Sequence, residues 1–203
     1  MIFVRYEDWR SYLRFYPVTA LMILANIIMF IVISIKGGVT NLNLLDLGAL
    51  TNIEPYSDEL WRYVASMFLH GGFSHLLFNC FALLVFAPPL ERLMGSWRYI
   101  ILYFLSGIIG NIITMAYYNS VQEPLLSIGA SGAIYGVYGA FLYIALLQRS
   151  LIDESSRKTL YAMLMFGIVF TIVTPDVNWA AHLGGLIGGF FVYGLIIRLL
   201  KKH

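Results

Sequence analysis

Six long apolar segments constrain the fold of this chain more than any other feature, because each is about as long as a helix that crosses a lipid bilayer. Hydrophobic residues make up 60% of the 203 residues and charged residues only 12%, which is far more apolar surface than one soluble domain needs. The sequence therefore predicts an all-α polytopic membrane protein, a bundle of six transmembrane helices. The segments are expected near 18–35, 72–88, 97–118, 131–148, 159–174 and 179–200.

Residues 1–17 have the pattern of an amphipathic helix that lies on the membrane surface. Apolar side chains recur every three or four residues, with arginines and acidic residues on the other faces. Pro17 is expected to end this helix. A cleaved signal peptide is rejected, because Lys36-Gly37-Gly38 stands where a small-residue cleavage site would follow the first apolar segment. The apolar series is Ile2, Tyr6, Trp9, Leu13 and Tyr16.

Residues 36–71 form the only long connection between apolar segments. They mix aromatic and apolar residues with acidic ones, so we expect a loop half-buried in the membrane interface. The single Cys80 excludes an internal disulfide. We find no Cys/His zinc pattern and no His-Glu-x-x-His motif, and we expect no metal or organic cofactor. The formal net charge is only +2, and no nucleic-acid partner is expected.

The basic residues predict how the chain crosses the membrane. Lys and Arg gather in the cytoplasmic loops of membrane proteins. With the amino terminus inside, the inner segments hold 11 of the 13 Lys and Arg residues, and the outer segments hold only Lys36 and Arg62. Both termini are therefore predicted to be cytoplasmic. Segments two, four and six then start at the outer face.

A serine and a histidine near the starts of two of these segments suggest catalysis. Ser131 lies in Gly129-Ala130-Ser131-Gly132 at the start of the fourth segment, and His182 lies just inside the sixth. A serine hydroxyl needs a base to take its proton, and imidazole titrates near neutrality. Ser131 could instead be only a helix N-cap. An ionisable group at the same membrane depth favours function.

The residues around Ser131 suit an oxyanion site. Gly129 permits backbone conformations closed to other residues and a close approach of substrate. Unpaired N–H groups at a helix start favour developing negative charge. Because the backbone before Ser131 is not confidently helical, we expect a wet pocket several ångströms below the surface.

His75 and Asn79 are four residues apart and share one face of the second segment. Two donors at the depth of Ser131 suit an oxyanion hole. Asn79 could instead simply hydrogen-bond to a neighbouring helix. We expect His70 to be structural, tying down the loop of residues 36–71.

Small residues suggest how the fourth and sixth segments meet. Gly132 and Gly136 are four apart, as are Gly185 and Gly189, and Gly184 and Gly188. Such faces let membrane helices approach closely, so the fourth and sixth segments are expected to meet along them. Tyr135 lies one turn below Ser131 and could pack against the imidazole of His182.

Two acidic residues are given no chemical role. Asp176 is a candidate third triad member, but a solvated turn residue is the simpler interpretation, so we expect a Ser-His dyad. Glu91 and Arg92 are expected to pair or cap locally.

Several motifs together resemble the rhomboid intramembrane serine proteases. The similarity covers the chain from about Trp61 to Gly189. The resembling motifs are Trp61-Arg62, the run from His70 to Asn79, Glu91-Arg92-x-x-Gly95, the run from Gly129 to Gly136, and Ala181-His182-Leu183-Gly184-Gly185.

The resemblance implies a rhomboid core over residues 18–203, of the minimal six-helix bacterial type. It implies proteolysis by Ser131 and His182, with His75 and Asn79 assisting the oxyanion. It also implies that the loop of residues 36–71 embeds in the outer leaflet. Substrates would be other membrane proteins, cut near their outer boundary, and the enzyme would lie in the inner (plasma) membrane.

The hypothesis is thus an intramembrane serine endopeptidase whose substrates carry helix-destabilising residues, since an intact helix hides its carbonyls. One alternative is a non-enzymatic rhomboid-like scaffold, which predicts a missing nucleophile or base. Another is a transporter or channel, which would need polar residues through the inner halves of the segments. Those halves are almost purely apolar here.

Overall fold

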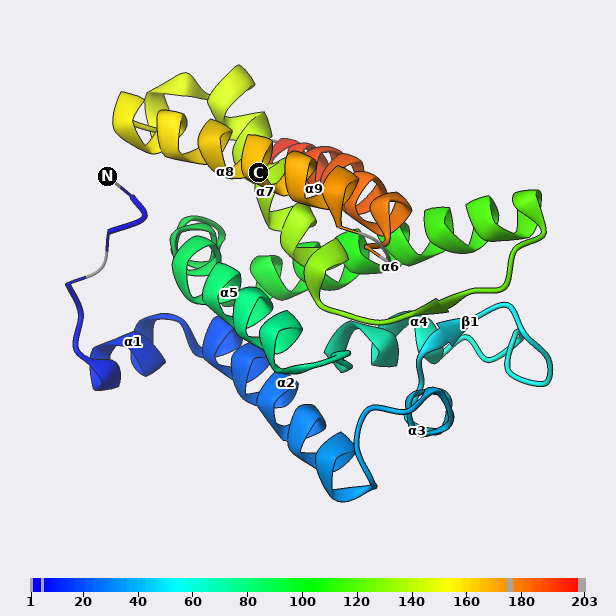
Figure 1. Cartoon of the computed structure of the whole chain (residues 1–203). Coiled ribbons are helices and arrows are strands. Elements are labelled where there is room, and N and C mark those ends of the chain that lie inside the picture. The colour runs from blue at the N-terminus through cyan, green and yellow to red at the C-terminus, as the bar shows by residue number, and fades with distance from the viewer. Residues whose placement is uncertain (1, 5, 175–176, 201–203) are drawn as a thin grey trace.

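The computed structural model describes residues 2–4, 6–174 and 177–200. Helices dominate this part of the chain, and two short strands form its one sheet (Figure 1). In chain order the elements are α1 (Trp9–Phe15), α2 (Pro17–Ile35), α3 (Asn41–Asp46), β1 (Leu50–Thr51), α4 (Arg62–Ala65), the 3₁₀ helix η1 (Ser66–Phe68), α5 (Phe73–Met94), α6 (Ser96–Val121), β2 (Leu126–Ser127), α7 (Ser131–Leu147), the 3₁₀ helix η2 (Arg149–Leu151), α8 (Glu154–Val173) and α9 (Trp179–Leu200).

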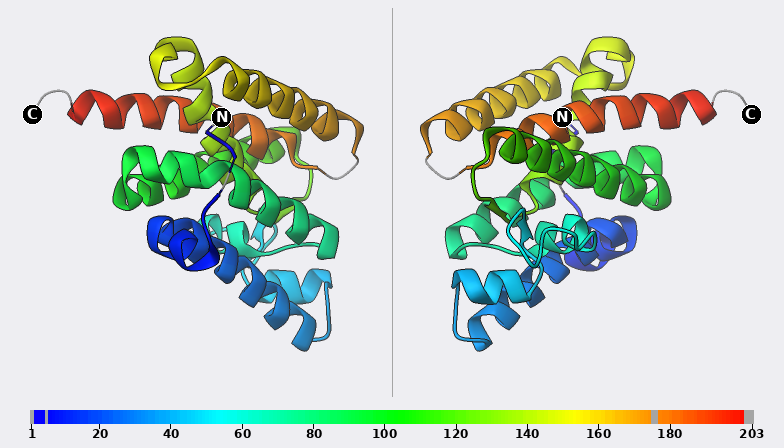
Figure 2. Two further views of the ribbon diagram at one scale, coloured as in Figure 1. Left: turned by 90° about the vertical axis from the view of Figure 1, so that its left-hand side faces the viewer. Right: turned by 90° about the vertical axis from the view of Figure 1, so that its right-hand side faces the viewer.

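Six apolar helices coincide with the six predicted segments, and the all-α polytopic fold is confirmed. By length and composition α2, α5, α6, α8 and α9 can each cross a membrane, and α7 is a shorter apolar helix of 17 residues. The helices α2 and α8 lie at opposite ends of the molecule in every view (Figure 2). They bury 22% and 17% of the residues in their most apolar windows, against 50% for α6.

The helix α7 is the centre of the bundle and packs closely on α9. A Cβ atom added to Gly185 would overlap the carbonyl oxygen of Gly132, and one added to Gly189 would overlap that of Gly136. Only glycine, which has no Cβ atom, fits at these two positions. Two of the three glycine pairs expected from the sequence therefore lie in the α7–α9 contact. The third corrects the expectation, since a Cβ at Gly184 or Gly188 would meet Ile113 or Ile109 of α6.

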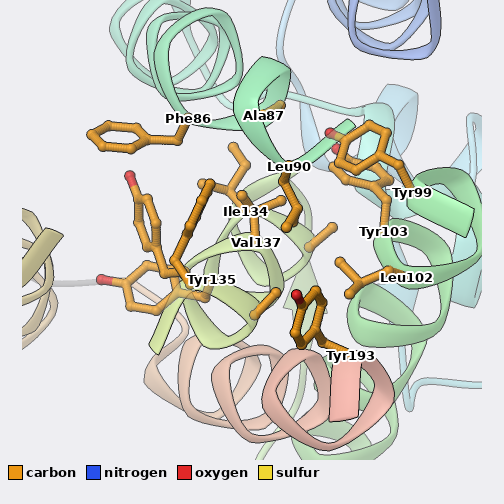
Figure 3. Close-up of a cluster of buried hydrophobic side chains, with 14 of the residues drawn as sticks. Phe86, Ala87, Leu90, Tyr99, Leu102, Tyr103, Ile134, Tyr135, Val137 and Tyr193 are labelled. Atoms are coloured by element: carbon orange, nitrogen blue, oxygen red, sulfur yellow. The ribbon is translucent and has the colours of Figure 1, made fainter. Parts of the chain in front are cut away.

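Aromatic and aliphatic side chains from four helices fill the core beside this contact. Figure 3 shows Phe86 and Leu90 of α5, Tyr103 of α6, Val137 of α7 and Tyr193 of α9 converging on one cluster. All five side chains are at most 2% exposed. Such dense packing fixes the axis of α7, and with it the position of Ser131.

The helix α5 corrects the expected end of the second segment. It was predicted to end near residue 88, but it continues through Pro88 and Pro89 to Met94. Pro88 cannot donate to the carbonyl of Leu84, and the hydroxyl of Tyr12 donates to that oxygen instead, at 3.4 Å. A donor from α1 thus partners the carbonyl that the proline leaves free.

The extra turns of α5 carry Glu91, whose buried carboxylate caps another helix. It accepts hydrogen bonds from the N–H groups of Val18 and Thr19, at 3.0 and 2.9 Å, at the start of α2. It also accepts from the hydroxyls of Thr19 and Ser96, each at 2.7 Å. The bond from Ser96 is local, as expected, but the cap on α2 is not, and Glu91 joins α2, α5 and α6.

The amino-terminal prediction was wrong in its extent. Among the described residues before Pro17, only Trp9–Phe15 are helical. Phe3 is buried in the core rather than lying on the surface. Its ring lies 5.0 Å from that of Phe86 and 5.2 Å from that of Phe141. The N–H of Ile2 donates to Ser156 Oγ of α8 at 2.8 Å. Burial of the apolar Phe3 ring favours this arrangement over a surface helix.

The connection of residues 36–71 is packed against the bundle, and it contains a strand that the sequence did not predict. The strand β1 pairs antiparallel with β2, with Leu50 opposite Ser127 and Thr51 opposite Leu126. Arg62 is 2% exposed, pairs with Glu59 at 2.7 Å, and donates to the carbonyls of Leu45 and Ala49. This connection supports the segment that leads into α7.

Candidate active site

Ser131 is the first residue of α7 and is half-buried. The segment before it is held from the connection of residues 36–71. The N–H of Gly129 donates to the carbonyl of Ser66 at 2.9 Å, and Thr51 Oγ1 donates to the carbonyl of Leu125 at 2.7 Å. The non-helical backbone before Ser131 is thus paired within the protein, as a membrane requires. The predicted wet pocket remains a prediction.

His182 lies in the first turn of α9 and is 7% exposed. Asn178 holds this turn in place, since its Oδ1 accepts from the N–H of Ala181 at 3.0 Å. Its Nδ2 donates to Ser127 Oγ at 2.8 Å. One side chain thus ties the start of α9 to the strand that precedes Ser131. Sequence reasoning missed Asn178, although an Asn just before a helical segment is a recognisable N-cap signal.

The structure brings the starts of α7 and α9 into contact. A Cβ at Gly132 would lie 3.4 Å from the carbonyl oxygen of Ala181 and 3.7 Å from its Cβ. The chain neighbours of Ser131 and His182 therefore touch. Within the described residues the Ser131 hydroxyl forms no hydrogen bond, and its pairing with His182 stays a prediction. Such bonds often tighten only when substrate is bound.

Two side chains hold the imidazole of His182. The Tyr135 ring stacks on it with centroids 4.1 Å apart and planes 9° from parallel, which is the contact expected from the sequence. Thr171 Oγ1 of α8 lies 2.8 Å from His182 Nδ1. Sequence reasoning missed Thr171, because it lies in an apolar helix whose rotation is set by tertiary contacts.

His75 and Asn79 gather beside Gly129. The backbone of Gly129 has a φ of +123°, and a Cβ there would lie 2.7 Å from His75 Nε2 and 3.8 Å from Asn79 Nδ2. His75 Nδ1 accepts from the N–H of Gly71 at 3.3 Å, so its Nε2 carries the hydrogen. Asn79 Nδ2 is buried and has no partner among the described residues. Two donors thus lie beside Gly129, two residues before Ser131.

His70 packs against His75 and is fully buried. Its Nδ1 lies 3.2 Å from the carbonyl oxygen of Phe68, and its ring centroid lies 5.0 Å from that of His75. Burial, and to a lesser degree the neighbouring His75, lowers the pKa of His70 from 6.5 to about 3. His70 is therefore neutral near pH 7, in keeping with the structural role expected for it.

Asp176, the alternative third triad member, lies outside the described residues, so its role is untested. No group of three or more metal-ligating side chains occurs within residues 2–4, 6–174 and 177–200.

Comparisons with known proteins identify the same region of the chain. A family profile described as "Rhomboid domain" matches residues 57–199. The chain is 35% identical over 204 residues to YdcA of Bacillus subtilis, whose name places it among the rhomboid proteases, and the match covers both proteins completely. It is 36% identical over 174 residues to "Rhomboid protease GluP" of the same organism, covering 85% of this chain and 33% of GluP. It is 31% identical over 158 residues to "RHOMBOID-like protein 5" of Arabidopsis thaliana, covering 77% of this chain and 50% of that protein.

Proposed function

Because this chain belongs to the rhomboid family, we propose that it is an intramembrane serine endopeptidase in which Ser131 is the nucleophile and His182 its base. The observation that carries the proposal is the unpaired amide of Asn79 beside Gly129. A buried donor without an acceptor is unfavourable unless a ligand supplies one. The oxygen of a bound scissile carbonyl is such an acceptor.

The contacts around His182 support the role of a base. The stack on Tyr135 and the hydrogen bond to Thr171 limit rotation of the imidazole. The glycine contacts between α7 and α9 hold the starts of those helices together. A dyad needs this fixed geometry, because reacting groups must be held within a few tenths of an ångström.

The proposed reaction proceeds by acyl transfer. Ser131 Oγ attacks the carbonyl carbon of the scissile peptide while His182 Nε2 takes the hydroxyl proton. The oxyanion receives hydrogen bonds from His75 Nε2, Asn79 Nδ2 and the N–H of Ser131. His182 then gives its proton to the leaving amine. Water attacks the acyl-enzyme, gives one proton to His182, and the serine hydroxyl is restored.

The proposed substrates are membrane proteins with a helix-destabilised transmembrane segment. Their carbonyls become available to Ser131 only where the helix unwinds. The distribution of Lys and Arg supports an orientation with both termini in the cytoplasm and the starts of α5, α7 and α9 near the outer face. In this orientation, cleavage occurs near the outer boundary of the plasma membrane.

The test is cleavage of a membrane-anchored reporter by purified, reconstituted enzyme. We expect Ser131→Ala and His182→Ala each to lower the rate by roughly 10³-fold or more, because the members of such a unit act together. A fluorophosphonate probe should label the wild type at Ser131. The matched control is Ser120→Ala, which removes an exposed hydroxyl that bonds only to the Tyr117 carbonyl; its rate should equal that of the wild type.

Two outcomes would reject the proposal. Wild-type rates in the Ser131→Ala variant would exclude this nucleophile. A wild type that binds membrane proteins, cleaves none and takes up no probe would instead support the non-enzymatic scaffold.

A further inference from the structure

We propose that Thr171 is a positioning residue that holds His182 in the tautomer with hydrogen on Nδ1. The inference rests on the proposed function and deepens it, because that tautomer leaves Nε2 free to take the Ser131 proton. It adds α8 to a site otherwise built by α5, α7 and α9. Thr171 belongs to α8, Tyr135 to α7 and His182 to α9.

The hydrogen bonds of Thr171 leave one consistent assignment of hydrogens. Thr171 Oγ1 lies 2.8 Å from the carbonyl oxygen of Gly167, which can only accept. The single hydroxyl hydrogen therefore points to Gly167. The same Oγ1 lies 2.8 Å from His182 Nδ1, so Nδ1 must donate to it.

The hydroxyl of Tyr135 completes this arrangement. It lies 3.3 Å from Thr171 Oγ1, where it can donate to the remaining lone pair. Thr171 Oγ1 then donates once and accepts twice, which is the full capacity of a hydroxyl. A saturated oxygen cannot turn toward another partner without losing a bond, so the direction of the imidazole is fixed.

A neutral oxygen thus takes the place that a carboxylate has in a Ser-His-Asp triad. When His182 accepts the serine proton, its Nδ1–H bond to Thr171 becomes a charge-assisted hydrogen bond, which is shorter and stronger than a neutral one. No permanent negative charge has to be buried in the membrane for this purpose.

The attachment of Thr171 makes the base sensitive to the position of α8. The buried residues of α8 are Ser156, Leu160 and Leu164, all in its first eleven residues. In the part of α8 that follows Gly167, Thr171 is the residue that forms polar contacts with the site, through His182 and Tyr135. If this end of α8 moves away from α9, His182 loses the acceptor that selects its tautomer.

The experiment compares Thr171→Val, Thr171→Ser and Thr159→Val in the full-length reconstituted enzyme. Valine keeps the shape of threonine but removes Oγ1, and serine keeps Oγ1. Thr159 is the matched control, because its hydroxyl makes the same kind of bond, to the carbonyl of Ser155 four residues earlier, away from the site. Steady-state cleavage gives kcat and KM, and ¹⁵N NMR of labelled imidazoles reports which nitrogen of His182 is protonated. The His182 signals are assigned by their loss in His182→Gln.

We expect Thr171→Val to lower kcat by about tenfold to a hundredfold, a range typical of a misplaced catalytic group, and to change KM by less than about twofold. Its spectrum should contain both tautomers of His182, whereas the wild type contains only the form protonated on Nδ1. Thr171→Ser should recover most of kcat and the single tautomer, and Thr159→Val should match the wild type.

The outcomes separate this inference from the proposed function. A wild type that cleaves while Thr171→Val keeps its kcat and its tautomer overturns the role of Thr171 and leaves the peptidase intact. A loss of kcat in Thr171→Val with the tautomer unchanged also overturns it, since the effect is then one of packing. A wild type without any cleavage overturns the peptidase, and the NMR spectra still decide whether Thr171 selects the tautomer.

Discussion

The helices α7 and α8 follow one another in the chain and are both apolar, yet they are held in different ways. In α7, 13 of the 17 residues are buried. In α8, only Ser156, Leu160 and Leu164 are buried among 20 residues, and its large apolar side chains are mostly exposed. An apolar sequence therefore does not distinguish a helix that packs against other helices from one that faces lipid, because both environments exclude water.

This difference divides the candidate site into a fixed part and an adjustable part. Ser131, Gly129, His75 and Asn79 belong to segments packed on several sides. Thr171, which contacts His182, belongs to α8, which has the smallest buried share of the five helices long enough to cross a membrane. Three experiments test this division, the first two on the fixed part and the last on α8.

The largest effect is expected for Gly185→Ala in the α7–α9 contact. The new methyl group would overlap the carbonyl oxygen of Gly132, and the atoms it meets are backbone rather than the end of a flexible side chain. We expect the free energy of unfolding in mixed micelles to fall by about 3 kcal/mol, at the upper end of overpacking effects. Gly72→Ala is the control, because a Cβ there meets nothing within 4 Å. Equal stability of the two variants would show that α7 is not rigidly held.

An intermediate effect is expected from His70 on acidification. The pKa of His70 is about 3 in the folded protein and 6.5 in the unfolded one, so the unfolded state binds more protons between these values. Stability should therefore decrease as the pH falls through this window, by about 2 kcal/mol between pH 7 and pH 5.

His70→Asn removes this titration and keeps a donor for the Phe68 carbonyl. Its unfolding free energy should depend less on pH than that of the wild type over this interval. The exposed N-cap of α8, Asp153, does not interfere, because hydrogen bonds from Ser156 lower its pKa from 3.8 and it titrates at more acidic pH. Parallel stability curves for variant and wild type would exclude His70 as the cause.

The smallest effect on stability is expected for Gly167→Ala in α8. Alanine favours the helix by about 1 kcal/mol over glycine. The new Cβ would lie 2.5 Å from the hydroxyl oxygen of Tyr135, and α8 can shift outward to relieve this contact. The unfolding free energy should change by less than about 1 kcal/mol. Cleavage should nevertheless slow severalfold, since Tyr135 stacks on His182. A loss of stability as large as that of Gly185→Ala would contradict an adjustable α8.

The sequence predicted the parts of this molecule that depend on local pattern. The lengths of the apolar segments predicted the six helices, and the spacing of glycines predicted the contact between α7 and α9. The prediction that three helices start at the same face brought Ser131, His75 and His182 near one another. The motif resemblance was confirmed at the level of the family. The catalytic roles of Ser131, His182, His75 and Asn79 remain proposals.

The features that were missed depend on contacts between distant residues. Phe3 enters the core because Phe86 and Phe141 leave a place for its ring, which the amphipathic pattern of residues 1–17 does not reveal. The strand β1 has two residues, too few for a recognisable alternation. The contact between Thr171 and His182 depends on how α8 is rotated about its axis, and no local sequence pattern predicts that rotation.

The cap that Glu91 provides for α2 has a consequence for biosynthesis. The N–H of Val18 and the carboxylate that accepts its hydrogen bond are 73 positions apart in the chain. The ribosome therefore makes α2 long before its cap, and the leading turn of that helix must meanwhile find partners in water or lipid headgroups. Until translation reaches Glu91, the newly made α2 lacks this bond to the rest of the bundle.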